Sequence, residues 1–365
     1  MESFWSAFEG VEDPRKSNVR YRLSDVLFIA LAALLSGSET CSDMAEFGNA
    51  KIDYLSEIID LPHGTPSHDT FSRVFRLIDP RQFEPVFADF AAQFKGGLGE
   101  VIAVDGKALR GAYERGRKSN PLHTVSLWAT QARATIATTL APGRNEIKGV
   151  LAALQLVDLT GCMVTADALH CRGDVTEMIV KQGGDFCIVL KANQPDLSSH
   201  ATRLLDASVA AGMTGATLGP DISHDREETR TALVVVADAL SDQHKIKQIN
   251  AFGRVTSLRQ PINGSMASLQ TRLYILSKPI SASELLKISR AHWGIENNLH
   301  HILDVTLKED ACRSRKDNGP INLAALRRVT LNILKRHPHK TSIRLKIKCA
   351  AWNNQFLSEL LAHMR

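Results

Sequence analysis

The sequence has 365 residues, of which 44% are hydrophobic and 23% charged, so it encodes a globular protein of two or three domains rather than a disordered chain. The net charge of +5 is only mildly basic, and the longest apolar run, Val26–Leu35, is too short to span a bilayer. The six cysteines form no CxxC pair and no zinc-like spacing, and the N-terminal stretch is acidic and polar, unlike a signal peptide. We therefore expect a reducing, cytoplasmic location.

Positive charge is unevenly distributed along the chain. Basic residues cluster in Arg110–Lys118, Arg313–Lys316 and Arg327–Lys348. This distribution suits a polyanionic partner, although a solvated helix face explains any one cluster equally well.

The first 95 residues are predicted to be helical. Leu23–Leu35 is apolar almost all round, which indicates a buried helix, with Ser24 as its N-cap and Gly37 as its stop. Residues 67–94 predict two helices joined by an Asp-Pro turn, the first of them capped by Ser67 or Asp69. Such a pair resembles a helix-turn-helix in outline, but packing alone also accounts for it.

An α/β pattern begins near residue 100. Glu100–Gly111 contains a short apolar strand that ends in Asp105-Gly106. Two β-rich segments follow as a predicted hairpin, and then helix, strand, helix and strand alternate. The segments are 123–130, 134–141, 145–157, 162–167, 175–181 and 186–191.

Residues 196–275 break this rhythm. Strand-like stretches at 230–238, 251–258 and 270–277 indicate an inserted, mainly β segment. From Ser283 the pattern is again helical, through about His337.

Three acidic residues are candidates for one catalytic site. Asp105 and Asp167 each directly follow a predicted strand, where functional side chains of α/β sheets gather, although an aspartate there often only caps a turn. Glu296 lies in a polar helix, near His292 and Leu299 on one face, whereas Asn297, His300 and Asp304 share the adjacent face. The alternative is a solvated helix side anchored by Trp293.

Convergent carboxylates imply bound cations. Three carboxylates at one point repel each other unless cations neutralise them, and hard oxygen ligands suit Mg²⁺ or Mn²⁺. Two such ions about 4 Å apart support in-line phosphoryl transfer. The acids therefore predict a metal-dependent nuclease or strand-transferase.

Six separated motifs together resemble the ISAs1-type insertion-sequence transposases, which include the H-repeat-associated proteins of bacterial Rhs loci. They are GTPSHDTFSRVFRLIDPRQFE (64–84), IAVDGKALRG (102–111), VTADALHCR (164–172), VLKANQP (189–195), HDREETR (224–230) and RAHWGIENNLHHILDVTLKEDACR (290–313).

The resemblance implies an α/β fold of RNase H-like type with a β-rich insertion, preceded by an α-helical N-terminal domain. We expect boundaries of 1–97 for the helical domain, 98–195 for the first part of the catalytic core, 196–276 for the insertion and 277–365 for the C-terminal helices that carry the third acid. The resemblance also implies a DDE site in which Asp105, Asp167 and Glu296 hold two Mg²⁺ or Mn²⁺ ions.

The chain departs from related families on the helix of the third acid. There, related helices carry a Tyr, an Arg four residues before the Glu and a Lys seven residues after it. The corresponding residues here are Ser289, His292 and Leu303. Rival third ligands nearby are Asp304, Glu309 and Asp310. Glu296 is preferred because it matches the motif position and because a glutamate reaches farther from a helix.

Several polar residues are candidates for DNA contact. For Lys107, Arg110, Lys191 and Asn193 the alternative is a surface residue in a loop. His224, Arg226 and Arg230 lie in the insertion, where the alternative is a salt-bridged β surface. The candidates near the third acid are Arg290, Asn297, His300 and Lys308.

The sequence thus predicts a DDE transposase that binds the terminal inverted repeats of its element, cleaves DNA and joins the freed 3′-hydroxyl to target DNA. We expect a homodimer or larger assembly on double-stranded DNA, in the bacterial cytoplasm with the nucleoid, and no membrane. Two alternatives stay open: a catalytically silent or domesticated sequence-specific DNA-binding protein, and a metal nuclease that cuts without transfer.

Overall fold

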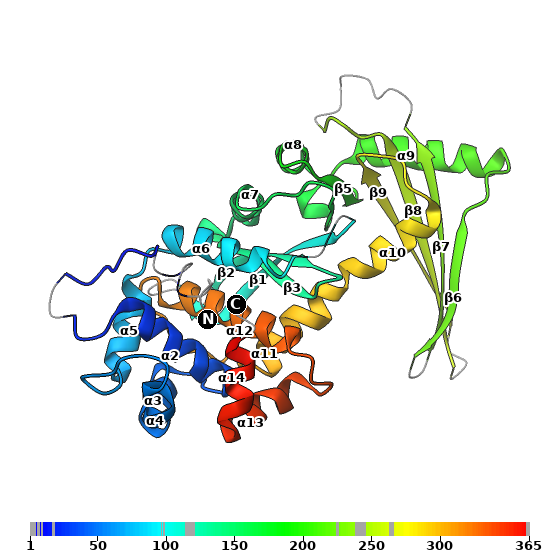
Figure 1. Cartoon of the computed structure of the whole chain (residues 1–365). Helices are drawn as coiled ribbons and strands as arrows, with labels where there is room; N and C mark the ends of the chain where they lie inside the picture. The colour runs from blue at the N-terminus through cyan, green and yellow to red at the C-terminus, as the bar shows by residue number, and fades with distance from the viewer. Residues whose placement is uncertain are drawn as a thin grey trace.

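The computed structural model describes residues 5, 8, 10–16, 19–95, 97, 99–113, 121–223, 226–237, 246–262 and 266–362. Two features from the sequence lie outside them: the end of the basic segment Arg110–Lys118, and His224. Figure 1 shows an N-terminal helical region, a central sheet covered by helices, and a projecting β unit.

The N-terminal region consists of short helices around one buried helix. They are α2 (Leu23–Leu35), α3 (Cys41–Ala50), α4 (Ile52–Ser56), α5 (His68–Leu77) and α6 (Pro80–Ala92). Helix α2 is buried throughout, which confirms the prediction from its all-round apolar sequence. Its predicted N-cap is wrong, because Arg22 takes that position, whereas Gly37 ends the helix with a φ of +97° as expected.

The two helices predicted in residues 67–94 are confirmed as α5 and α6. Ser67 is the N-cap residue of α5, but its side chain makes no capping hydrogen bond. Asp79 caps α6 by accepting from the Arg81 backbone N–H, and Pro80 occupies the first turn, where its missing N–H costs nothing.

Nine strands of the described chain form one mixed sheet, in the order β3-β2-β1-β4-β5-β9-β8-β7-β6. Three consecutive strands come first, and two helices then alternate with the next two strands: β1 (Val101–Tyr113), β2 (Pro121–Ala129), β3 (Ala134–Leu140), α7 (Glu146–Gln155), β4 (Met163–Ala166), α8 (Gly173–Lys181) and β5 (Asp185–Leu190). Strands β1, β4 and β5 are parallel, whereas β1–β2 and β2–β3 are antiparallel. This arrangement confirms the predicted α/β fold class with its helical N-terminal region.

Strand β1 is longer than the sequence predicts. Its parallel pairing with β4 ends at Val104, opposite Ala166, but its antiparallel pairing with β2 continues to Leu109. Asp105 therefore lies within β1, not at its end, at the point where one neighbouring strand stops and leaves the carboxylate accessible.

The predicted insertion contains one helix and four strands: α9 (Pro195–Ala210), β6 (Ala216–Ser223), β7 (Arg226–Val236), β8 (Ala251–Pro261) and β9 (Ser268–Leu276). Because β9 pairs with β5, the insertion extends the central sheet. Helix α9 was not predicted, although Leu197, Ala201 and Leu205 are buried at a spacing of four. Helices α7, α8 and α9 cover one face of the sheet, and α10 (Ala282–His292) lies against the other.

The C-terminal region is interrupted rather than continuously helical. After α10 come the π-turn η3 (Glu296–His300), α11 (His301–Val305), α12 (Gly319–Arg336), α13 (Ile343–Trp352) and α14 (Asn354–Ala362). The prediction of an unbroken helical pattern to about His337 is wrong between α11 and α12, where Lys308 and Asp317 have positive φ. Helix α12 packs against α2, α5, α6 and β3, so both ends of the chain share one core. The four-part division of the chain stays a prediction.

Candidate active site

Three elements bring the predicted acids to one cavity. Asp105 lies in β1, Asp167 directly follows β4, and Glu296 opens η3. Because β1 and β4 are adjacent and parallel, both aspartates lie at the same edge of the sheet. All three acids line a cavity of about 240 Å³ beneath α10.

Asp105 and Glu296 form the closest pair of these acids. Their carboxylate oxygens and a ring nitrogen of His300 lie within 4.8 Å of one another. Burial, followed by the negative charge of Glu296, raises the pKa of Asp105 to about 8. The hydrogen bond with His300 instead lowers the pKa of Glu296. Among the described residues, no lysine or arginine forms an ion pair with Asp105 or Glu296, although Lys191 and Arg272 line the same cavity. A divalent cation would offset the repulsion between the two carboxylates.

Asp167 is held by its own histidine. Nδ1 of His170 lies 2.8 Å from Asp167 Oδ1, and the Leu169 backbone N–H donates to the same carboxylate. Although burial raises the pKa of Asp167, the close contact with His170 outweighs it and lowers the pKa below its ordinary value. Asp167 is therefore ionised, and the 3-10 turn η2 (Ala168–His170) fixes its direction. His170 was not among the predicted site residues, although it follows Asp167 by three residues.

His292 lies on the opposite wall, from α10. Its Nδ1 is 3.0 Å from Thr165 Oγ1, a hydrogen bond between α10 and β4. Burial lowers the pKa of His292 to about 4, so the ring is neutral at pH 7. It occupies the position at which the resemblance leads us to expect an arginine, and the neutral ring brings no positive charge to the acids.

A π-turn carries the third acid. Glu296 and His300, which the sequence placed on adjacent helix faces, are in contact across η3, with 3.3 Å between Nδ1 and Oε2. Leu299 and Leu303 are fully buried in the core that the N-terminal helices share, and they fix the turn from below. Single π-turns within helices are rare and occur mainly at functional sites.

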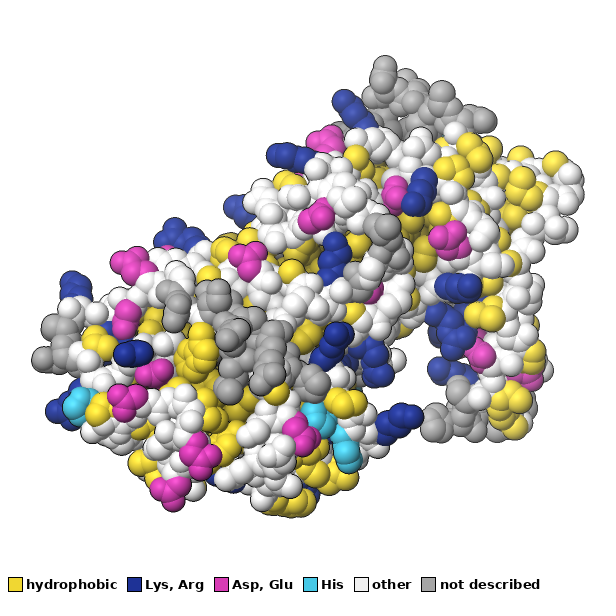
Figure 2. Space-filling view, in the orientation of Figure 1, with side chains coloured by type: hydrophobic (Ala, Val, Ile, Leu, Met, Phe, Trp, Pro, Cys, Tyr) yellow, Lys and Arg dark blue, Asp and Glu magenta, His cyan; other side chains and the backbone are white. Residues whose placement is uncertain are grey.

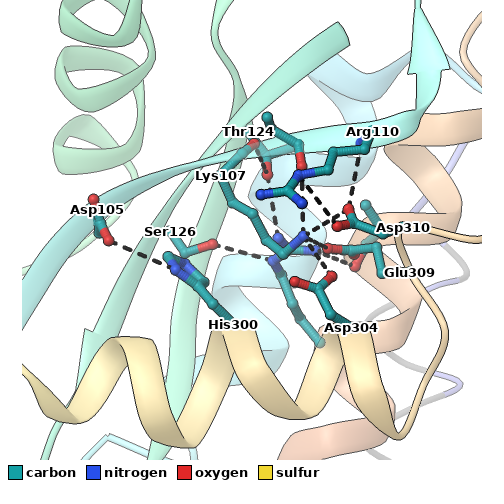
Figure 3. A network of polar contacts seen from close by, with 12 residues as sticks. Asp105, Lys107, Arg110, Thr124, Ser126, His300, Asp304, Glu309 and Asp310 are labelled. Atoms are coloured by element: carbon teal, nitrogen blue, oxygen red, sulfur yellow. Dashed lines mark hydrogen bonds and ion pairs between the residues drawn. The ribbon is translucent and has the colours of Figure 1, made fainter.

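The rival acids belong to a separate charge network. Lys107 Nζ lies 2.7 Å from Asp304, 3.4 Å from Glu309 and 3.1 Å from Asp310, as Figure 3 shows. Arg328 closes the network from α12 with a bond of 2.8 Å to Glu309. These three acids thus pair with lysine or arginine, whereas the ion-pair partner found for Asp105 and Glu296 in the described chain is His300.

Lys107 is buried, whereas the sequence suggested an exposed lysine that contacts DNA. Its side chain is only 7% exposed, and all of its charge faces carboxylates. Arg110 is 81% exposed and lies beside Asp310, where DNA can reach it.

Four arginines in the strands of the insertion share one face of its sheet, whereas Arg254 of β8 lies on the other face and pairs with Asp206 of α9. Successive residues of a strand point to opposite faces. Ala232, Val255 and Leu276 pack toward α10, so Arg226, Arg230, Arg259 and Arg272 lie on that same face. Together with Arg290 of α10 these arginines line a groove of about 420 Å³, and we call the five residues the arginine face. Figure 2 shows Lys and Arg side chains gathered on the inner side of the β6–β9 unit.

The other candidates for DNA contact fall into different settings. Lys191 is exposed on the rim of the acid cavity, and Asn297 is exposed in the arginine-face groove. The Asn193 amide donates to the Ala168 carbonyl at 2.7 Å and thereby holds the turn after Asp167. Arg230 and Arg290 both pair with Asp221. Lys308 is exposed in the turn after α11.

Two members of the arginine face, Arg259 and Arg272, were missed by the sequence analysis. Arg272 also stacks on the half-exposed Trp293, with 4.9 Å from its guanidinium carbon to the ring centroid. Strand alternation in the sequence could have identified Arg272, because it lies two residues before Tyr274 and therefore on the same face of β9 as this buried residue.

Comparison with known proteins gives two family matches and several relatives. Residues 96–333 match the family described as "Transposase DDE domain", and residues 5–91 match "DDE_Tnp_1-associated". The chain is 30% identical to "Putative transposase YncI" of Escherichia coli O157:H7, covering 95% of this chain and 91% of that one. It is 31% identical to "H repeat-associated putative transposase YhhI" of Escherichia coli strain K12, covering 94% and 93%.

Among solved structures, the chain resembles the piggyBac transposase synaptic complex with hairpin DNA, with a TM-score of 0.41 and 11% identity over 98% of this chain and 77% of that one. A search of the described helices for a stretch long and apolar enough to cross a membrane finds none.

Proposed function

Since the chain belongs to the DDE transposase family, we propose that it is an active transposase that cleaves DNA strands at the ends of an insertion sequence and transfers them to target DNA. The observation that carries this proposal is the convergence of Asp105, Asp167 and Glu296 on one cavity. A family member that had lost catalysis would have no need to keep all three acids in one cavity.

The three acids are the proposed ligands of two Mg²⁺ or Mn²⁺ ions. Their fit rests on the closeness of Asp105 and Glu296, for which no ion pair with lysine or arginine is found in the described part of the chain, whereas the nearby acids pair with Lys107. Divalent ions would supply the activation of a water or 3′-hydroxyl and the stabilisation of the leaving oxygen. The chain's own residues orient these acids: His170 holds Asp167, and the buried Leu299 and Leu303 hold the turn of Glu296.

We further propose that the core is RNase H-like and that double-stranded DNA lies along the arginine face. Guanidinium groups suit phosphate oxygens, and the arginine-face groove and the acid cavity share Arg272, Ser289 and Trp293 as lining residues. Phosphates bound along the groove would thus lead directly to the acids. Assembly as a dimer or larger complex on paired ends, in the bacterial cytoplasm, belongs to the same proposal.

The test compares the native chain with Asp167→Asn on a labelled duplex that carries the terminal repeats flanking its gene, in Mg²⁺ or Mn²⁺. Because the substitution keeps the size and removes the charge, we expect the variant to fold normally and to lose cleavage by at least about a hundredfold. Asp196→Asn, at an exposed aspartate of α9, is the matched control and should cleave as the native chain does.

Each outcome separates the proposed activities. Cleavage by the native chain and the control alone supports catalysis at this cavity, and joined products on a target plasmid distinguish transfer from simple nuclease activity. Binding of the repeats without cleavage by any of the three proteins favours the catalytically silent DNA-binding protein. Equal cleavage by native chain and Asp167→Asn contradicts the role of Asp167.

A further inference from the structure

His300 is a buried histidine with its ring directed at the acid site. Its side chain is 8% exposed, and Figure 3 shows the ring pointing from its helix toward Asp105. Nδ1 lies 3.6 Å from Asp105 Oδ2 and 3.3 Å from Glu296 Oε2. Nε2 has no hydrogen-bond partner within the described part of the chain, so the polar contacts found for this ring are with the two acids.

The distances from His300 Nδ1 to the two carboxylates suit three ligands of one metal ion better than a direct ion pair. A charge-assisted bond between a ring nitrogen and a carboxylate is about 2.7–2.9 Å long. His170 approaches Asp167 to such a distance, 2.8 Å. Neighbouring ligands of one octahedral ion are about 3 Å apart, since metal–ligand bonds are about 2.1 Å long. His300 lies slightly beyond that separation from two carboxylates at once, and it therefore needs only small shifts to bind the same ion.

We propose that His300 is a nitrogen ligand of the divalent ion that Asp105 and Glu296 hold, which makes this site a mixed nitrogen and oxygen site. The inference rests on the proposed function, because it concerns one of the ions assigned there. It differs from the DNA-contact role that the sequence suggested for His300, which the burial of the ring disfavours.

The π-turn supports the same assignment. Residues four apart on a helix face each other, and the widened turn from Glu296 to His300 directs both side chains at Asp105 of β1. The neighbouring His301 is exposed and lies on the other side of the helix, so the chain contains its own control at the adjacent position.

The nitrogen ligand has a consequence for metal choice. Mg²⁺ prefers oxygen ligands, whereas Mn²⁺ accepts both carboxylate and imidazole. We expect the native site to bind Mn²⁺ more tightly than Mg²⁺. His300→Asp supplies an oxygen ligand in place of the nitrogen, so the difference in affinity between the two ions should become smaller.

The experiment measures metal binding without DNA or turnover. Mn²⁺ is titrated into the full chain while the electron paramagnetic resonance signal of the free ion is followed, and pulsed measurements detect a directly bound nitrogen-14. We expect nitrogen coupling in the native chain and in His301→Gln. His300→Gln should lose the coupling and bind Mn²⁺ at least about tenfold more weakly. His300→Asp should bind Mn²⁺ without nitrogen coupling, which also shows that the variant site is folded.

The outcomes separate this inference from the proposed function. Mn²⁺ bound by the native chain without nitrogen coupling overturns the ligand role of His300, and so does coupling that persists in His300→Gln. If Asp105→Asn no longer binds Mn²⁺ while one of these two results is obtained, the metal site formed by the acids is still supported. If the native chain and Asp105→Asn both fail to bind Mn²⁺, the proposed metal site is wrong and the inference falls with it.

Discussion

Lys107 illustrates what a single residue's sequence context leaves open. It comes just after Asp105 and beyond the predicted end of the strand, and this made Lys107 a candidate for phosphate contact, but in the structure it lies within β1. Its carboxylate partners lie about 200 residues away in sequence, beyond the reach of any local pattern. For the acids, the local pattern holds for Asp167, which directly follows β4, but not for Asp105, which lies within β1. The two are near each other because β1 and β4 are neighbouring strands.

We predict that Lys107→Met destabilises the fold rather than only weakening DNA binding. The substitution leaves Asp304, Glu309 and Asp310 facing one another without the central cation, and breaking a buried ion pair costs about 3–5 kcal/mol. The free energy of unfolding in urea at pH 7 measures this, with Lys287→Met at an exposed lysine of α10 as control. If both variants unfold alike while only Lys107→Met loses affinity for DNA, Lys107 is a DNA contact after all.

At the scale of elements, the sequence predicted what depends on periodicity and missed what depends on pairing partners. The hairpin β2–β3 and helix α7 follow from alternation and helical spacing. The full length of β1 does not, because β2 alone continues to pair with it. Nor does the π-turn: the sequence from Glu296 to His300 has the pattern of an ordinary helix, and Leu299 and Leu303 are buried in a core that includes residues far away in sequence.

The docking of α6 on β3 should depend on pH. Glu84 of α6 accepts the Leu140 backbone N–H at 3.0 Å, and burial raises its pKa from 4.5 to about 7. A carboxyl whose pKa is higher in the folded state favours folding in its protonated form. Its contribution is complete below pH 4.5 and is lost as the pH rises through 7.

Glu84→Gln should therefore match the native chain at pH 4.5 and exceed its free energy of unfolding by about 1–3 kcal/mol at pH 8. The amide oxygen can still accept from Leu140, so the hydrogen bond is kept. Unfolding in urea at both pH values tests this, with Glu46→Gln at an exposed glutamate of α3 as control. A gain of equal size at pH 4.5 and pH 8 would exclude titration of Glu84 as the cause.

On the scale of the whole molecule, the β6–β9 unit projects from the core and turns one face toward the rest of the chain, as Figure 1 shows. The cavity that the acids line runs from β1 across β4 and β5 to β9, where the sheet passes from the core into this unit. Motif order along the sequence predicted that an insertion precedes the third acid. It could not predict that β9 pairs with β5, which is what places the arginine face beside the acids.

This placement predicts which side of the β6–β9 unit carries DNA. Arg226 and Arg259 lie on the arginine face, whereas Arg203 is exposed on α9, which covers the opposite face. Each phosphate contact releases counterions, so the slope of log affinity against log salt should fall by about 1 in magnitude for Arg226→Ala and for Arg259→Ala.

Arg203→Ala removes the same charge and should leave the slope unchanged. Fluorescence anisotropy of a labelled repeat duplex from about 50 to 200 mM salt covers the range in which such slopes are resolved. A smaller slope in Arg203→Ala alone would place the duplex over α9, on the far side of the sheet from Asp105, Asp167 and Glu296. DNA bound there could not reach the three acids without passing around the sheet, and catalysis at the cavity would then require a second binding surface.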